Sequence, residues 1–175
     1  MNVLEVFHKK LRFETKGNKA TYFDITEECK AFLKEIDANN GLLVIQSPHT
    51  TCSVFFEEMV HDYDALEDEY LQQDLNKGLR IIFPKQLSYD DYYKYPGREH
   101  RMWGSTLKTS ALKENPSILL NADAHLKSSI IGSNLNIVIK DGTLLIRNYG
   151  HIYFVDFDSN RVRQRNCNLC CLKLN

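Results

Sequence analysis

The stretch LNIVIKDGTLLIRN, from Leu135 to Asn148, indicates most clearly how this chain folds. Two apolar runs rich in β-formers flank the pair Asp141-Gly142. An Asp-Gly pair in this context favours a type I′ turn, in which both central residues adopt positive φ. We therefore predict a β-hairpin over this stretch.

Other segments on both sides of the hairpin also favour strands, because they are short, apolar and rich in β-branched or aromatic residues. The predicted strands are Leu4–Thr15, Thr21–Ile25, Gly41–Ser47, Cys52–Glu58, His151–Phe157 and Arg161–Leu174.

Three segments have the spacing of helices. The first follows Asp24 and Glu27, which resemble a capping box, and precedes Gly41, which suits a left-handed helix stop. The second begins with acidic residues, which favour the positive end of a helix dipole. The three predicted helices are Ile25–Ile36, Asp62–Leu79 and Asn121–Gly132.

The segment from Pro84 to Asn115 has no clear period, and we expect an irregular loop of the kind that is usually functional or mobile. The chain shows no repeat or linker, and its 175 residues match the usual size of one domain. We therefore expect residues 1–175 to form one α+β domain, with a mixed or antiparallel sheet layered against helices.

The composition argues against nucleic acid and membranes as partners. The formal net charge is -1, so no global field attracts a polyanion. The N-terminal residues lack the pattern of a signal peptide, and no apolar run approaches the length of a membrane span. The five cysteines are an odd number and are expected as reduced thiols, which favours a cytoplasmic location.

The stretch SPHTTCSVFFEE, from Ser47 to Glu58, places His49 and two threonines between two apolar runs. A side chain at such a junction can reach into a pocket, so we predict that His49, Thr50 and Thr51 border a site. The two glutamates that end the stretch face opposite sides of a strand, and only one of them can point toward His49.

Three histidines lie in short polar contexts: His49, His100 and His125. If they converge, neutral imidazoles suit a divalent transition metal with an open position. A carboxylate nearby could orient an imidazole or act as general base. Histidines in such a chain are more often structural or solvated, so this hypothesis depends on their convergence.

The motif NADAHLKSS, from Asn121 to Ser129, suggests an anion site. Free backbone amides at a helix start bind anions, and Lys127, Ser128 and Ser129 could add donors. The alternative is that Asn121 or Asp123 caps the helix while Lys127 is solvated.

Two C-terminal motifs also leave alternatives open. RVRQR (161–165) fits either a phosphate-facing strand or an exposed edge strand. CNLCC (167–171) would need further zinc ligands, but the remaining Cys29 and Cys52 fit core positions, so we expect no structural zinc there.

Taken together, these motifs resemble the YjbQ family (UPF0047), also called the secondary thiamine-phosphate synthase family. The resemblance covers nearly the whole chain and rests on the HTT motif, NADAHLKSSIIGSN, the Asp-Gly hairpin, GHIYFVDFD and the early segment FETKGNKATYFDITEE. NADAHLKSSIIGSN is the most specific of these motifs, whereas HTT alone would be a weak one.

The resemblance implies a compact α+β fold, a homotrimer and sites near subunit boundaries. It matches His49 and His125 to recurrent histidines, makes His100 the best candidate for a third, and matches Glu58 to the glutamate at a strand end. Two departures are expected to fall near the same pocket. Residues 147–151 replace the usual Gly-Thr-Trp-Gln-Gly, and the segment 101–120 is longer than usual.

The resemblance also implies an enzyme with thiamine-phosphate synthase activity, which joins a pyrimidine diphosphate to a thiazole phosphate. On this reading His49, His125 and Glu58 are catalytic, and Thr50, Thr51, Lys127, Ser128 and Ser129 bind phosphate. A divalent metal ion, zinc or magnesium, would be held by His49, His100 and His125. The alternatives are a metal-dependent hydrolase of a phosphorylated or amide substrate, and a non-catalytic trimer that binds a small anionic metabolite.

Overall fold

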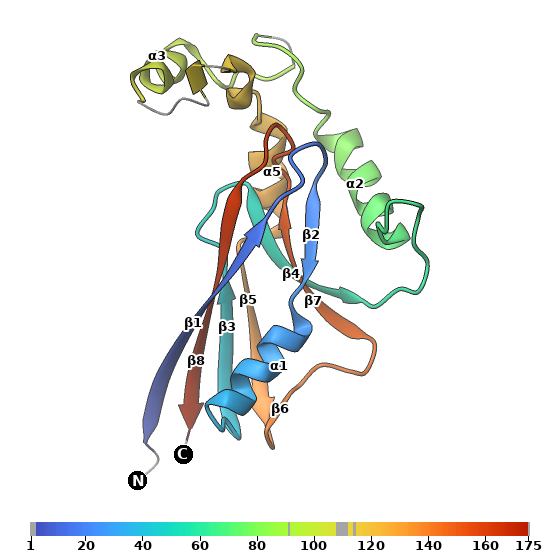
Figure 1. Cartoon of the computed structure of the whole chain (residues 1–175), viewed down its shortest axis with the longest axis vertical. Coiled ribbons are helices and arrows are strands. Elements are labelled where there is room, and N and C mark those ends of the chain that lie inside the picture. Colours follow the sequence, from blue (N-terminus) through green and yellow to red (C-terminus); the bar gives the residue numbers. More distant parts are fainter. Residues whose placement is uncertain (1–2, 91, 108–111, 114, 175) are drawn as a thin grey trace.

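The computed structural model describes residues 3–90, 92–107, 112–113 and 115–174. Two antiparallel sheets form the body (Figure 1), one with the order β1-β8-β3-β5-β6 and the other with the order β2-β7-β4. The strands are β1 (Leu4–Glu14), β2 (Thr21–Asp24), β3 (Asn40–Gln46), β4 (Cys52–Glu58), β5 (Asn134–Lys140), β6 (Thr143–Leu144), β7 (Gly150–Asp156) and β8 (Gln164–Leu174). The helices are α1 (Thr26–Glu35), α2 (Tyr70–Ile82), α3 (Arg98–Thr106), the 3-10 helix η1 (Pro116–Leu119) and α5 (Ala122–Ile131).

The hairpin predicted around Asp141-Gly142 is confirmed. Strands β5 and β6 pair antiparallel through Lys140 and Thr143. Asp141 and Gly142 have φ angles of 52° and 76°, the two positive values that a type I′ turn requires. The second strand of the hairpin is shorter than predicted, because β6 ends at Leu144.

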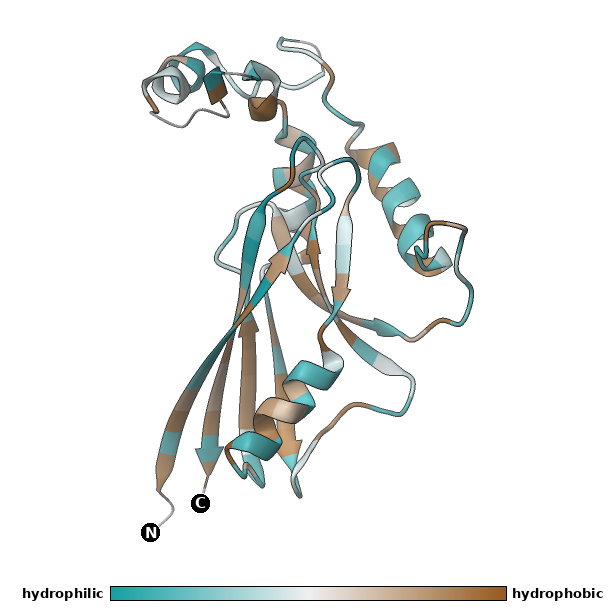
Figure 2. Cartoon of the chain, in the orientation of Figure 1, coloured by the Kyte–Doolittle hydropathy of each residue, from teal (hydrophilic) through white to brown (hydrophobic). Residues whose placement is uncertain are grey.

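The main core lies between the two sheets and beneath α1. Leu43 and Leu169 of the five-stranded sheet meet Phe154 of the smaller sheet and Phe32 of α1, and all four are at most 2% exposed. Figure 2 shows that hydrophobic residues dominate the end of the five-stranded sheet beside α1. The α+β fold class predicted from the sequence is therefore confirmed, with antiparallel pairing throughout the described strands.

The smaller sheet has a second packed face. Val155 and Phe157 lie against Leu79 of α2 and Ala124 of α5. Strand β4 thus has the main core on one side and α5 on the other. This packing positions the β3–β4 turn, which contains His49, beside α5.

The segment from Pro84 to Asn115 is only partly irregular, because it contains α3. Figure 1 shows α3 and η1 projecting from the body as an arm above the start of α5. None of the helices in the described ranges is long and apolar enough to cross a membrane.

Candidate functional site

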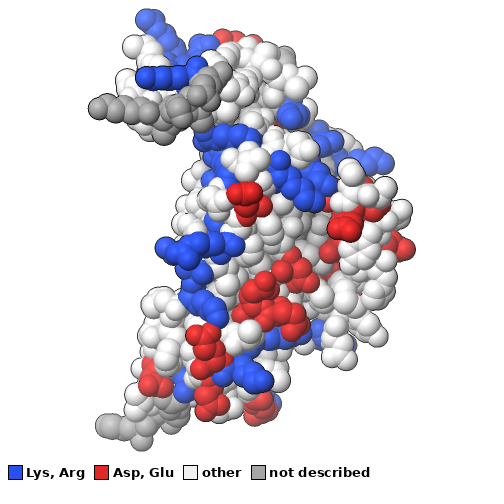
Figure 3. All heavy atoms as spheres, in the orientation of Figure 1, with Lys and Arg blue, Asp and Glu red and all other residues white. Residues whose placement is uncertain are grey.

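A cavity of about 410 Å³ lies where the arm meets the body of the protein. Its walls come from the β3–β4 turn, the arm, the start of α5 and the chain that enters β8. The lining includes His49, His100, His125, Arg161, Arg163, Arg165, Thr50, Thr51, Asn121, Tyr95 and Trp103. Figure 3 shows Lys and Arg side chains gathered at this junction between arm and body. We call this cavity the arginine–histidine pocket.

The three arginines come from the chain that leads into β8 and from the first residues of that strand. Arg161, Arg163 and Arg165 are two residues apart, and all three line the pocket. Strand β8, which contains Arg165, lies between β1 and β3 and is not an edge strand. The edge-strand interpretation of RVRQR is therefore wrong.

Two buried aspartates hold these arginines in place. Asp156 is 0% exposed and accepts a hydrogen bond from Arg165 Nε at 2.6 Å. Asp158 is 1% exposed, and its Oδ2 lies 2.5 Å from Arg163 Nη2. Such charge-assisted contacts fix the orientation of a guanidinium group. Arg161 forms no ion pair with a carboxylate among the described residues, so two carboxylates face three guanidinium groups and the positive charge of the cluster is only partly neutralised.

The HTT turn is tied to this cluster through Thr51. Its hydroxyl donates to Asp156 Oδ1 at 2.9 Å and accepts from Arg165 Nη2 at 3.1 Å. The hydroxyl is therefore already engaged within the protein. Thr50 also lines the pocket and is exposed.

His49 contributes a neutral imidazole with a defined tautomer. The backbone N–H of Asn166 donates to His49 Nε2 at 3.0 Å, so in the neutral ring Nδ1 carries the proton. Burial, followed by the charge of Arg165, lowers the pKa of His49 below its ordinary value. At neutral pH this ring is an N–H donor.

His125 comes from the first turns of α5, four residues after Asn121, so both side chains lie on the helix face that borders the pocket. Burial is the largest influence on His125 and lowers its pKa. A hydrogen bond to the backbone carbonyl of Thr50 acts in the opposite direction. One ring nitrogen is thereby a donor to Thr50, which leaves the other as an acceptor in the neutral ring.

The arm and the residues just before α3 supply an aromatic wall of the pocket. Tyr95 Oη lies 2.9 Å from His100 Nε2, and the Tyr95 ring meets His125 edge-on with centroids 5.6 Å apart. Trp103 is 5.1 Å from His100 between ring centroids and is 55% exposed. The arm thus brings His100 to the same pocket as the other two histidines.

The structure gives no support to a metal ion bound by the three histidines. Each of His49, His100 and His125 uses one ring nitrogen in a contact within the protein, and an imidazole can bind a metal only through its other nitrogen. Among the residues that the structure describes, no group of three or more His, Cys, Asp or Glu side chains could hold a metal. A zinc or magnesium ion on these histidines therefore stays a prediction without support. The described cysteines of CNLCC are free thiols.

Several predicted phosphate ligands point elsewhere. Lys127 is 6% exposed and pairs with Asp123 at 2.6 Å, while the hydroxyls of Ser128 and Ser129 donate to the carbonyls of Cys52 and His125. The side chain of Lys127 is therefore buried and ion-paired rather than solvated, and it does not line the pocket.

The first amide of α5 and Glu58 also lie outside the predicted site. The Ala122 N–H donates to Gln86 Oε1 at 2.9 Å. Glu58 is exposed at the opposite end of β4 from the HTT turn, and a seven-residue strand spans about 20 Å. Glu58 cannot serve the histidines within one subunit.

The two departures from the family pattern have different positions. Trp103 and Leu119 of the longer segment line the arginine–histidine pocket. Arg147 and His151 line a separate cavity of about 620 Å³ beside α1. His151 Nδ1 lies 2.5 Å from Asp24 Oδ2 there, so the new histidine has its own partner.

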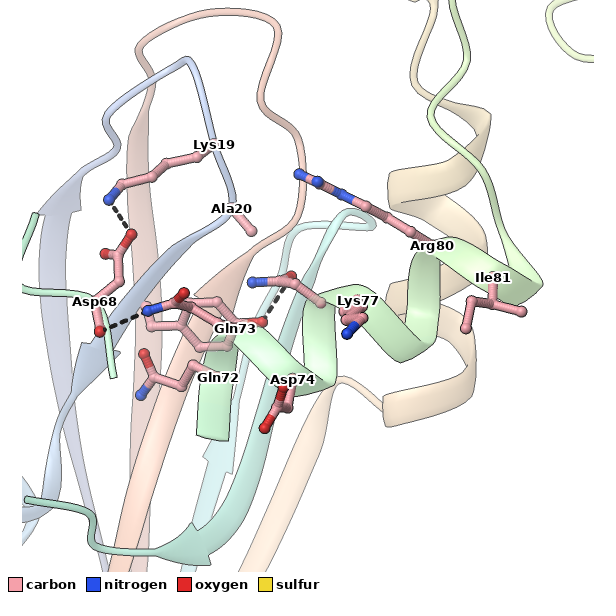
Figure 4. Close-up of a pocket in the computed structure, with 11 residues that line it drawn as sticks. Lys19, Ala20, Asp68, Gln72, Gln73, Asp74, Lys77, Arg80 and Ile81 are labelled. Carbon is pink, nitrogen blue, oxygen red and sulfur yellow. Dashed lines mark hydrogen bonds and ion pairs between the residues drawn. The ribbon is translucent and has the colours of Figure 1, made fainter. Parts of the chain in front are cut away.

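Another cavity, of about 720 Å³, lies between the β1–β2 turn and α2 (Figure 4). Lys19 is paired with Asp68, whose backbone carbonyl also accepts from Gln73 Nε2 at 3.0 Å. Asn76 accepts a hydrogen bond from Tyr22. These contacts pair several of the polar lining groups within the protein, and no histidine lines this cavity. We therefore regard the smaller arginine–histidine pocket as the candidate site.

Together, the fold and the pocket define a class of small α+β proteins in which two antiparallel sheets support a basic, histidine-containing pocket. The family model described as "UPF0047 protein YjbQ-like" matches residues 9–173. The chain belongs to this family.

Relatives of the chain match most of its length. UPF0047 protein YugU of Bacillus subtilis is 26% identical and covers 80% of this chain and 82% of its own length. UPF0047 protein MJ1081 of Methanocaldococcus jannaschii is 27% identical, with 87% and 88% covered. A YbjQ-like protein of unknown function from Sulfolobus solfataricus has the same fold, with a TM-score of 0.69 at 16% identity over 98% of this chain and 99% of its own.

Proposed function

We propose that the arginine–histidine pocket binds a small phosphorylated metabolite and promotes a transfer in which a phosphate or pyrophosphate group departs. One observation carries this proposal: three arginines and three histidines from distant parts of the chain line one cavity. Arginine is well suited to phosphate recognition because its planar donors match phosphate oxygens.

Each group has a role that its contacts support. Arg161 and Arg163 would stabilise the negative charge that develops on the departing group, while Arg165 anchors the HTT turn through Thr51. His125 would accept a hydrogen bond from an N–H or O–H group of the substrate, since its lowered pKa keeps one nitrogen free of a proton at neutral pH. His49 would donate from Nδ1 to the same anion.

The formation of thiamine phosphate, which the family resemblance implies, is a reaction of this class. A pyrimidine diphosphate loses pyrophosphate, and the ring nitrogen of a thiazole phosphate forms the new bond to carbon. Arginine side chains can stabilise the departing pyrophosphate. A hydrolase that depends on metal held by the three histidines has less support, because no group of three or more His, Cys, Asp or Glu side chains among the described residues could hold a metal.

The test compares wild type with His125→Gln in assays for thiamine phosphate and for released pyrophosphate. We expect the variant to lose about tenfold in turnover, the effect of one hydrogen bond that is lost in the transition state. His61→Gln, an exposed histidine outside the pocket, is the matched control and should retain activity. Binding of the phosphorylated substrates without turnover in wild type would favour the non-catalytic binder instead.

We also propose a cytoplasmic homotrimer. The five cysteines are free thiols, as a reducing compartment predicts. The trimer is what the family resemblance implies. Its candidate contact surface is the outer face of the five-stranded sheet, where Val6 and Val138 are 50% and 51% exposed.

A further inference from the structure

One buried acceptor in the arginine–histidine pocket has no partner. Asn121 is 7% exposed and lines the pocket, and its Nδ2 donates to Asp158 Oδ2 at 3.0 Å. Its Oδ1 is buried without a hydrogen bond, and the side chain does not cap α5. A buried acceptor left unpaired is costly, so such an atom in a pocket suggests a donor on the ligand.

The orientation of this amide follows from chemistry. Asp158 is an acceptor because its Oδ2 also lies 2.5 Å from Arg163 Nη2. The amide must therefore present Nδ2 to Asp158, which leaves Oδ1 directed away. Arg163 and Asn121 line the same pocket and share Asp158 as a partner, so an anion bound at Arg163 is close to the Asn121 amide.

Whereas Asn121 Oδ1 lacks a hydrogen-bond donor, two arginines of the pocket lack acceptors. The Nε atoms of Arg161 and Arg163 are buried donors without partners. An anion would satisfy donors of this kind, whereas Asn121 Oδ1 would repel an oxygen that carries no proton. The two requirements together describe an anion that also provides a hydrogen-bond donor.

We infer that the pocket selects a protonated oxyanion, or a phosphoryl group beside an O–H or N–H donor, over an anion without a proton. Asn121 is the specificity-determining acceptor, and Asp158 is the positioning residue that sets the direction of its amide. This inference rests on the proposed function only in requiring that the pocket bind anions.

Hydrogen phosphate and sulfate form a matched pair of probes. At pH 7.5 phosphate is mainly a dianion with one O–H, whereas sulfate is a dianion of the same shape with none. Titration calorimetry on the full chain at constant ionic strength should show phosphate binding about tenfold more tightly than sulfate, the effect of one unsatisfied buried acceptor.

Variants test the two assigned roles. Asn121→Ala removes the acceptor and should bring the phosphate-to-sulfate affinity ratio close to one. Asp158→Asn supplies a side chain that can donate to Asn121, which frees the amide to turn, and should lower or reverse the ratio. Asn76→Ala, an amide of α2 outside the pocket, should keep the wild-type ratio.

The outcomes separate this inference from the proposed function. If wild type binds neither anion, the proposed phosphate pocket fails and the inference fails with it. If wild type binds both anions equally, or if Asn121→Ala keeps the full preference, the inference alone is overturned. The wild-type ratio is decisive even if a variant does not fold.

Discussion

His125 shows how burial sets the chemistry of a single side chain. The ring is held at the start of α5, where desolvation lowers its pKa and a hydrogen bond to the Thr50 carbonyl limits that shift. Because burial disfavours the charged form, the neutral ring persists to lower pH than in a free histidine, whose pKa is about 6.5.

We therefore predict that His125 titrates below pH 6.5. The unfolded chain takes up this proton first as the pH falls, so the contribution of His125 to the free energy of unfolding is present above that pH and is lost below it. NMR titration of histidine ring protons, with the His125 signal assigned by its absence in His125→Gln, measures the midpoint. A midpoint at or above 6.5 would contradict the burial argument.

Residue patterns predicted part of the pocket. His49, His100 and His125 were singled out from their polar contexts, and all three line one cavity. The arginines were left undecided because RVRQR has the same period on an edge strand and on an interior one. Only the pairing of β8 with both β1 and β3 resolves this, and that pairing is a long-range property.

The elements differ from prediction where local signals compete. The acidic residues after Asp62 favour a helix start there, but α2 begins at Tyr70. Asp64 instead accepts hydrogen bonds from the N–H groups of Leu66 and Asp68 and forms a turn of its own. Short polar side chains bind nearby backbone in this way and compete with helix formation.

Gly41 of β3 and Gly78 of α2 have different structural roles. Gly41 was expected to stop α1, yet α1 ends at Glu35 and Asp37 takes the positive φ of 51°. Gly41 lies in β3 with φ near 150°, where an added Cβ would lie 2.1 Å from the Leu172 carbonyl oxygen. Gly78 of α2 has nothing within 4 Å of an added Cβ.

This contrast predicts opposite effects of one substitution at the two positions. Gly78→Ala should raise the free energy of unfolding by about 0.5–1 kcal/mol, since alanine favours a helix over glycine. Gly41→Ala should lower it by about 1–3 kcal/mol, because the backbone there is strained for any residue with a Cβ. Chemical denaturation of both variants measures the changes. Equal effects of the two substitutions would contradict the conformational argument.

At the scale of the whole molecule, one face of the five-stranded sheet carries apolar side chains that no described element of the chain covers, with Val6 and Val138 half exposed. Val6 pairs with Leu172, Leu172 with Leu42, and Leu42 with Val138, so these four apolar residues form a row across four strands. Their neighbours along each strand point into the core instead. Residues directly opposite on paired strands share a face, and an exposed apolar row of this kind suggests an interface.

We expect the purified protein to have three times the 20.4 kDa mass of the chain, with the row Val6–Leu172–Leu42–Val138 buried between copies. Light scattering coupled to size-exclusion chromatography measures this mass. Val138→Glu places a charge in the row and should yield smaller species, because a buried unpaired charge strongly disfavours association. Val162→Glu changes a valine that is 57% exposed outside the row and should leave the mass unchanged. A wild-type mass equal to one chain would exclude the trimer, whereas a Val138→Glu protein that remains trimeric would mean that copies meet through another surface.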